Sequence, residues 1–141
     1  MTPDRDRLRI LVVDDSRTSR LALERILEPY GDCELGANGE DAIKAFAMAW
    51  EQGRPYDLIC MDIMMPHVDG IQALMIIRRM ERERGILKQD GAKVVVVTNI
   101  DNPSIVFEAY YRGGADAYLY KPVDRAKLIS ELKRLGLADQ D

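Results

Sequence analysis

Histidine and cysteine are scarce in this chain, which has one His and two Cys among 141 residues. Cys33 and Cys60 lie in separate apolar segments without CxxC spacing, and we interpret them as reduced, buried thiols of a cytosolic protein. His67 follows an apolar run, and we interpret it as an ordinary loop residue. With no cluster of these two residue types, a soft transition-metal site is not expected.

An excess of positive charge and a long apolar run are also missing. The formal net charge is −4 at pH 7, so there is no electrostatic reason to expect direct binding of nucleic acid or of an anionic membrane. No apolar run approaches the roughly 20 residues of a membrane span. The first ten residues are polar and lack the apolar segment of a signal peptide. We therefore expect a cytoplasmic protein that does not insert into a membrane.

Short apolar, β-branched runs are present instead, and they alternate with helical patterns. The runs predict five strands, at residues 8–14, 33–36, 56–62, 93–99 and 117–120. Five helices are predicted, one after each strand. Strict alternation is typical of an α/β fold, a doubly wound parallel sheet with helices on both faces. We predict a polar N-terminal arm at 1–7, a single domain at 8–136 and a C-terminal tail at 137–141.

The third predicted helix combines an apolar face with a charged end. Its apolar spacing predicts that Ile71, Leu74 and Met75 point inward. The stretch RRMERERGILKQDG, residues 78–91, is interpreted as a solvated helix end and loop.

Polar side chains stand where the predicted strands end. Asp14 and Asp15 end the first strand, Asp62 the third, Thr98 the fourth, and Lys121 follows the fifth. Taken singly, each has an ordinary explanation: a helix cap, a turn carboxylate, a strand end or a solvated lysine. Because the carboxyl ends of parallel strands share one edge, where open α/β sheets bind ligands, we expect these five residues to converge.

The combined chemistry of these residues favours phosphoryl transfer. Three carboxylates repel one another unless cations are close, and Lys121 or a divalent metal can supply the charge. Mg²⁺ prefers oxygen ligands and uses one or two carboxylates. An aspartate beside Mg²⁺ can attack phosphorus, while a hydroxyl and an ammonium hold the phosphoryl oxygens.

Four motifs give the chain a family resemblance. ILVVDDS, DLICMDIMMPHVDG, VVVVTN and GADAYLYKPV occur in this order between about residues 8 and 136. With this spacing, the chain resembles the receiver domain of two-component response regulators, in particular the single-domain regulators of the chemotaxis type. The resemblance implies a flavodoxin-like sheet of order 2-1-3-4-5, with two helices on one face and three on the other.

The resemblance also implies a role for each site residue. Asp62 would accept a phosphoryl group from a sensor histidine kinase or a phosphotransfer protein. Asp15, Asp62 and the backbone carbonyl of Met64 would bind Mg²⁺ directly, and Asp14 would act through a metal-bound water. Lys121 would pair with the phosphate.

Further residues are implied as the switch. Thr98 would move toward the phosphoryl group, and Tyr118 would turn inward behind it. The surface formed by the fourth helix, fifth strand and fifth helix would change, altering the binding of an unidentified protein target. The Lys121–Pro122 peptide bond is expected to be cis.

The chain departs from the family pattern at a few positions. Asn99 stands where a small residue is usual, which affects phosphoryl access or the Thr98 shift. Met64 and Ile100 flank the expected path of an attacking water and are apolar, so we hypothesise slow autodephosphorylation. The segment 81–91 is longer than usual.

Alternative functions stay open at this point. A haloacid-dehalogenase-type phosphohydrolase also uses a strand-end aspartate with Thr and Lys. It requires D-x-D after the first strand, however, and here that strand ends Asp14-Asp15-Ser16. A degenerate receiver that only binds partners is disfavoured by the full set of site residues. The chain could also be a fragment of a longer regulator.

Overall fold

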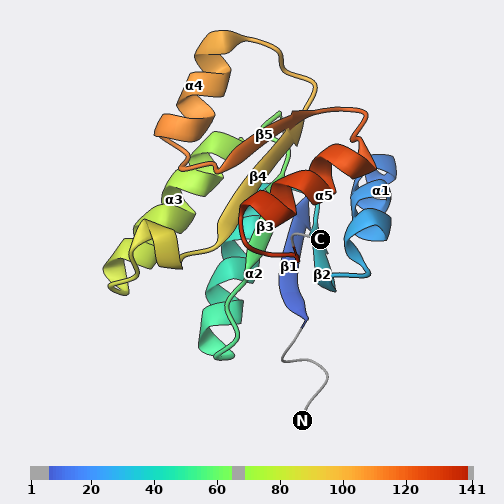
Figure 1. Cartoon of the computed structure of the whole chain (residues 1–141). Helices are drawn as coiled ribbons and strands as arrows, with labels where there is room; N and C mark the ends of the chain where they lie inside the picture. The colour runs from blue at the N-terminus through green and yellow to red at the C-terminus, as the bar shows by residue number, and fades with distance from the viewer. Residues whose placement is uncertain (1–6, 65–68, 140–141) are drawn as a thin grey trace.

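The fold is a five-stranded parallel sheet between two layers of helices (Figure 1). The computed structural model describes residues 7–64 and 69–139, so the interpretation of His67 lies outside the described residues. The strands are β1 (Leu8–Val13), β2 (Gly31–Gly36), β3 (Leu58–Met61), β4 (Lys93–Thr98) and β5 (Ala117–Tyr120). Their order is β2-β1-β3-β4-β5, which confirms the fold class.

Five α-helices connect and cover the strands. They are α1 (Arg17–Leu27), α2 (Gly39–Glu51), α3 (Gly70–Glu83), α4 (Pro103–Tyr111) and α5 (Arg125–Arg134), with a short 3₁₀ helix η2 (Lys88–Asp90) before β4. α1 and α5 contribute buried side chains to one apolar cluster, whereas α2, α3 and α4 contribute to the other. Within the described residues, no helix is long and apolar enough to cross a membrane.

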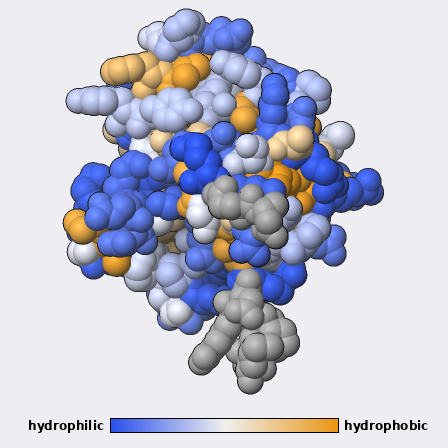
Figure 2. Space-filling view, in the orientation of Figure 1, coloured by the Kyte–Doolittle hydropathy of each residue, from blue (hydrophilic) through white to orange (hydrophobic). Residues whose placement is uncertain are grey.

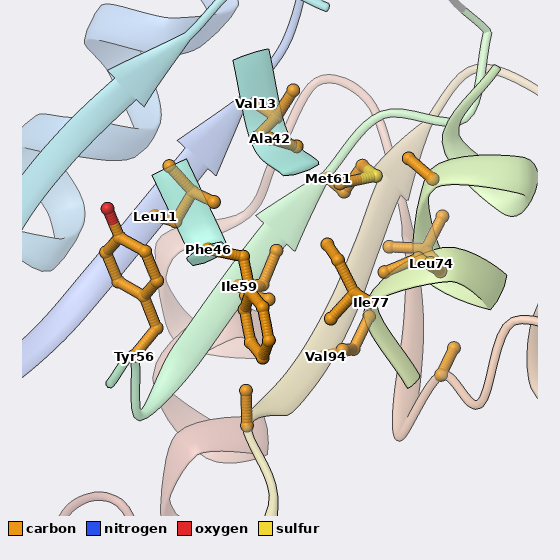
Figure 3. Close-up of a cluster of buried hydrophobic side chains, with 14 of the residues drawn as sticks. Leu11, Val13, Ala42, Phe46, Tyr56, Ile59, Met61, Leu74, Ile77 and Val94 are labelled. Atoms are coloured by element: carbon orange, nitrogen blue, oxygen red, sulfur yellow. The ribbon is translucent and has the colours of Figure 1, made fainter. Parts of the chain in front are cut away.

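The central strands are apolar on both faces because helices cover both faces. All four residues of β3 are buried, and alternate residues enter opposite clusters. Ile59 and Met61 pack with Phe46 and Leu74 on the side of α2 and α3 (Figure 3). Cys60 faces the cluster formed with α1 and α5.

Side-chain caps begin the five helices as their sequences favour. The cap residues are Ser16, Asn38, Asp69, Asn102 and Asp124, and each accepts a hydrogen bond from a backbone N–H in the first turn. These bonds satisfy N–H groups that have no partner within the helix. The caps fix where each helix begins, and α1, α3, α4 and α5 each follow a loop or strand end that carries one or more of the polar strand-end residues.

Two predictions of burial are wrong. Met75 was expected in the core, but its side chain is 37% exposed, and Ala73, Leu74 and Ile77 form the buried face of α3. Cys33 is half-buried and not fully buried, since it lies on the edge strand β2.

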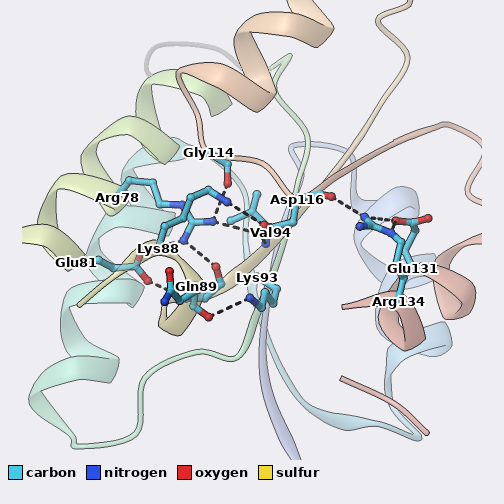
Figure 4. A network of polar contacts seen from close by, with 11 residues as sticks. Arg78, Glu81, Lys88, Gln89, Lys93, Val94, Gly114, Asp116, Glu131 and Arg134 are labelled. Carbon is cyan, nitrogen blue, oxygen red and sulfur yellow. Dashed lines mark hydrogen bonds and ion pairs between the residues drawn. The ribbon is translucent and has the colours of Figure 1, made fainter. Parts of the chain in front are cut away.

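The charged end of α3 is also not simply solvated, contrary to the prediction. Arg78 and Glu81 are buried, and Arg78 Nη1 lies 2.8 Å from Glu81 Oε1 (Figure 4). Arg78 also donates to the carbonyls of Ala92 and Gly114, at 2.8 and 2.7 Å. Asp116 pairs with Arg78 Nη2 at 3.3 Å. A buried charge is tolerated only with such partners. Glu81 lies three residues away on the same helix, and the other partners come from loops distant in sequence.

Candidate functional site

The strand ends bring the five predicted site residues to the same edge of the sheet. Asp14 and Asp15 follow β1, Asp62 follows β3, Thr98 is the last residue of β4, and Lys121 follows β5. Carboxylate oxygens of the three aspartates lie within 4.8 Å of one another. Asp14, Asp62 and Thr98 are buried, whereas Asp15 is exposed. The site is thus open to solvent on the side of Asp15.

Lys121 joins the two buried carboxylates. Its Nζ lies 2.8 Å from Asp14 Oδ2 and 2.8 Å from Asp62 Oδ2. The contact with Asp62 has hydrogen-bond geometry. The contact with Asp14 is an ion pair, and Asp14 Oδ2 receives no well-aligned hydrogen bond from any described residue. One ammonium is therefore shared by two buried carboxylates, and the Asp15 carboxylate lies within 4.8 Å of both.

The backbone around these carboxylates holds their other oxygens. Ser16 N donates to Asp14 Oδ1, and Met64 N donates to Asp62 Oδ1, both at 2.9 Å. Arg20 Nη1 donates to the Asp14 carbonyl at 2.7 Å and ties α1 to the end of β1. These contacts fix the carboxylate positions before any ligand binds.

Gly70 brings the start of α3 against the loop that carries Asp62. A Cβ at this position would lie 2.5 Å from Ile63 Cα and 2.6 Å from the Asp62 carbonyl oxygen. Only glycine permits so close an approach without a backbone shift. The approach is reinforced by a hydrogen bond from Gly70 N to the Ile63 carbonyl.

Burial and charge oppose each other in this site. Burial raises the pKa of Asp14, and the contacts with Lys121 and with Ser16 N offset only part of that rise. Burial alone would lower the pKa of Lys121, but its contacts with Asp14 and Asp62 outweigh burial and leave that pKa raised. Lys121 therefore stays an ammonium at neutral pH.

The donor set fits a hard divalent cation. Three carboxylates meet a single ammonium, which leaves excess negative charge at the strand ends. Asp14 Oδ2 is buried and lacks a well-aligned hydrogen-bond donor among residues 7–64 and 69–139, so this oxygen has capacity for a further partner. Carboxylate oxygens beside solvent are the ligands that Mg²⁺ uses while keeping several waters. The residues therefore fit Mg²⁺.

A second chain of contacts leads from Thr98 toward the surface of β5. Ile100 N donates to Thr98 Oγ1 at 3.4 Å, and Tyr118 Oη donates to the Ile100 carbonyl at 2.8 Å. Tyr118 is half-buried against the core and lies near the rings of Tyr110 and Tyr120. The Tyr118 hydroxyl is thus hydrogen-bonded to the loop that follows Thr98. The Lys121–Pro122 peptide bond is cis.

Sequence reasoning missed Arg20 and the linking role of Ile100. Arg20 acts on a backbone carbonyl six residues earlier, and helical spacing alone does not distinguish it from a solvated arginine. Ile100 acts through its backbone, which carries no sequence signal. The loop conformation after β4 decides both of its contacts.

Comparison with known proteins agrees with this geometry. The model of the response regulator receiver domain family matches residues 10–133. Chemotaxis protein CheY of Treponema pallidum is 33% identical over 126 residues, which cover 88% of this chain and 79% of that protein. Protein CcdB of Bacillus subtilis is 36% identical over 130 residues, covering 90% of this chain and 96% of that protein.

Other relatives are much longer than this chain. Sensory/regulatory protein RpfC of Xanthomonas campestris pv. campestris is 33% identical over 133 residues, and the matched part spans 17% of its length. The chain therefore corresponds to a small part of that protein.

Solved structures share the fold. One is a chain of the co-crystal structure of the Saccharomyces cerevisiae phosphotransfer protein Ypd1 with the receiver domain of Ssk1. It has a TM-score of 0.78 and 26% identity, covering 96% of each chain. A chain of the Borrelia burgdorferi CheX–CheY–BeF3–Mg complex has a TM-score of 0.78 at 23% identity, covering 96% of this chain and 98% of that one; this likeness is one of fold alone.

The family match does not favour the phosphohydrolase alternative. The match spans the segments that contribute all five strand-end residues, and the strand order is the one that the resemblance implied. The chain belongs to the response regulator receiver domain family, whose members are phosphoacceptor domains in two-component signalling.

Proposed function

We propose that Asp62 is the phosphoacceptor of this domain. The observation that carries the proposal is that Asp62 lies 2.8 Å from the Lys121 ammonium and within 4.8 Å of the carboxylates of Asp14 and Asp15. A carboxylate oxygen of Asp62 attacks the phosphorus of a phosphohistidine, a P–O bond forms, and the P–N bond breaks. The bonding electron pair leaves with the imidazole, which takes up a proton.

The surrounding residues neutralise charge during this transfer. Lys121 Nζ is 2.8 Å from Asp62 Oδ2 before reaction and is placed to pair with an incoming phosphoryl oxygen. Asp15, Asp62 and the Met64 carbonyl would hold Mg²⁺, with Asp14 acting through a bound water. The metal supplies positive charge toward the phosphoryl oxygens. The domain takes part in its own phosphorylation and dephosphorylation and serves signalling.

The conformational change that follows phosphorylation would begin at Thr98. This hydroxyl already contacts the Ile100 amide, and Ile100 contacts Tyr118. If Thr98 shifts toward a phosphoryl oxygen, the 99–102 loop and Tyr118 must adjust, and with them the face formed by α4, β5 and α5. This small local change biases an element with two arrangements.

The phosphodonor is proposed to be a sensor histidine kinase or a histidine phosphotransfer protein. Support comes from the Ypd1 complex with the receiver domain of Ssk1, a relative in fold at 26% identity. The downstream partner is proposed to be a protein that reads the α4-β5-α5 face.

Acetyl phosphate with Mg²⁺ provides a direct test of acceptor identity. We expect intact-mass measurement to show one added phosphoryl group in the wild type and none in Asp62→Asn. Asp90→Asn, a change at an exposed carboxylate of η2, is the matched control and should label normally. Equal labelling of Asp62→Asn would overturn the proposal. Sustained phosphate release from a generic phosphomonoester would instead support a phosphohydrolase.

A further inference from the structure

A continuous groove lies between α3 and α4, and one of its ends adjoins the loop that carries Asp62. A hollow of about 420 Å³ is lined by Gln72, Met75, Ile76, Arg79, Arg82 and Arg112. A neighbouring hollow of about 390 Å³ shares Gln72, Met75 and Arg112 with it. Because the two hollows share walls, they form one groove that runs along α3.

The end of the groove nearer to Asp62 is mainly apolar. Its lining includes Ile63, Ile71, Ile100 and Ile105. It also includes two acidic residues, Asp69 and Glu108, and Glu108 is paired with Arg112. Ile63 follows Asp62 directly, and the backbone of Ile100 contacts both Thr98 and Tyr118. Figure 2 shows hydrophobic side chains gathered over α4 and surrounded by hydrophilic ones. Ile71, Ile100 and Ile105 are half-buried and Ile63 is buried, and a hollow with apolar walls and polar residues around it is typical of a binding site.

The other end of the groove, beside the last turns of α3, is basic. Arg79, Arg82 and Arg112 line the same hollow. Arg112 is paired with Glu108 at 3.2 Å, but within residues 7–64 and 69–139 neither Arg79 nor Arg82 has an acidic partner. In a chain of net charge −4, two guanidinium groups without an acidic partner in the described part of the chain create, beside an apolar hollow, a local field that favours an anionic ligand.

The segment between α3 and β4 extends the groove. A third hollow of about 300 Å³ shares Arg82 and Arg112 and adds Leu87 and Tyr111. The side chains of Leu87 and Tyr111 are 60% and 78% exposed. The unusually long 81–91 segment thus provides an exposed apolar side chain at the basic end.

We propose that this α3–α4 groove binds an acidic amphipathic peptide segment of a partner protein. Apolar side chains of the segment would occupy the isoleucine-lined part and cover Met75, while its carboxylates would meet Arg79 and Arg82. From Ile71 to Arg82 the groove follows α3 for about 17 Å, which matches about three turns of a partner helix. The apolar lining favours a peptide over a free phosphate or a nucleic acid backbone, which would use only the arginines.

A synthetic peptide can test this groove in the unphosphorylated protein, so the result does not depend on whether Asp62 accepts a phosphoryl group. The probe is a fluorescent helical peptide of about twelve residues, with leucines toward the end that would lie on the isoleucines and glutamates toward the end that would lie on Arg79 and Arg82. Fluorescence anisotropy gives the Kd, and amide chemical shifts of the ¹⁵N-labelled chain locate the site. We expect shifts on α3, α4 and the 84–91 segment.

Charge-reversed variants separate specific docking from general attraction. The double variant Arg79→Glu, Arg82→Glu should weaken binding by about tenfold or more. Both side chains are exposed and lack an acidic partner among the described residues, so the fold should persist; an unchanged amide spectrum away from α3 checks this. Arg25→Glu, at an exposed position on α1, is the control and should change Kd by less than about twofold.

Several outcomes would overturn the proposal. These are no binding up to about 1 mM peptide, equal binding by oligoglutamate or by the lysine version of the peptide, tighter binding of a single-stranded oligonucleotide, or a Kd that the double variant leaves unchanged. Amide shifts confined to another face would also contradict it.

Discussion

Lys121 and the aspartates around it explain why a carboxylate follows the apolar run of β3. Asp62 is buried, which costs free energy unless partners are present. Lys121 Nζ and Met64 N each bind one of its two carboxylate oxygens. Together with Asp62, Asp14 and Asp15 form a cluster of three carboxylates, and the excess negative charge of this cluster suits a divalent cation. At the residue scale, reactivity and stability therefore depend on the same few contacts.

The lifetime of the phosphorylated form tests the role of Met64. Its side chain is 61% exposed and apolar, so it can shield the acyl phosphate without orienting a water. We expect a lifetime of minutes or longer for the wild type, and a shorter one for Met64→Gln, whose amide can position the attacking water. Phosphate loss followed by intact mass measures both. Loss within seconds in the wild type would refute the shielding.

Cys33 provides a prediction of pH dependence. Burial, followed by the charges of Glu24 and Asp32, raises the pKa of Cys33 to about 11. At pH 8 only about one thiol in a thousand is then the reactive thiolate. We expect alkylation by iodoacetamide to be slow at pH 8 and to accelerate as pH rises toward 11.

The matched control for that measurement is Cys33→Ser. It leaves only Cys60, which is fully buried, so the folded variant should resist alkylation until denaturant is added. Reaction of the wild type at pH 8 as fast as that of a free cysteine would contradict the raised pKa of Cys33.

At the scale of elements, α3 is fixed at both ends in different ways. Gly70 brings its start against the backbone of Ile63. Near its other end, Arg78 and Glu81 bind the loops before β4 and β5, through Ala92, Gly114 and Asp116 (Figure 4). The helix thereby connects the carboxyl ends of the strands, where the site lies, to the loops that precede β4 and β5 at the amino ends of the strands.

Replacing the buried arginine tests this anchoring. Arg78→Met leaves the buried Glu81 without its ion pair, so we expect the free energy of unfolding to fall by about 3 kcal/mol. Arg79→Met, at the adjacent exposed position, should change it by less than about 0.5 kcal/mol. Urea unfolding of the three proteins gives both values. Equal stability of the two variants would show that the buried pair does not anchor α3.

The same helix shows how far sequence alone predicts structure. The strands were predictable because apolar runs such as that of β3 are buried on both faces, and Asp62 and Thr98 were predictable as site residues because they end such runs. The burial of Arg78 was not predictable. It depends on hydrogen bonds to the carbonyls of Ala92 and Gly114, which no local sequence pattern relates to Arg78. Met75 is exposed because α4 leaves a groove beside α3.

At the scale of the molecule, the phosphoacceptor site lies at the carboxyl ends of the strands. The two surfaces proposed to bind partner proteins are formed by other parts of the molecule. The α4-β5-α5 face lies behind Tyr118, and the α3–α4 groove lies beside Ile63 and Ile100. Both adjoin the loops that hold Asp62 and Thr98. The boundaries predicted for the arm at 1–7 and the tail at 137–141, and the cytoplasmic location, stay predictions.

Metal binding should stabilise the whole domain. A ligand that binds only the folded state at ten times its Kd adds about 1.4 kcal/mol to the free energy of unfolding. For a chain of this size, that corresponds to about 5 °C in Tm. We expect Mg²⁺ to raise Tm by this amount in the wild type, because the carboxylate cluster exists only in the folded chain.

Two variants control for general salt effects. Asp15→Asn should abolish the Mg²⁺-dependent rise and leave the metal-free Tm nearly unchanged, since Asp15 is exposed. Asp90→Asn should retain the full rise. A rise in Tm that Asp15→Asn preserves would place the metal elsewhere.

Chemical mapping of the acceptor tests the central claim most directly. After phosphorylation with acetyl phosphate and Mg²⁺, borohydride reduces an aspartyl phosphate to homoserine, which peptide mass spectrometry locates. The account predicts homoserine at position 62 and at no other aspartate. Homoserine at Asp14 or Asp15 in place of position 62, or an acid-stable phosphate on another residue type, would contradict it.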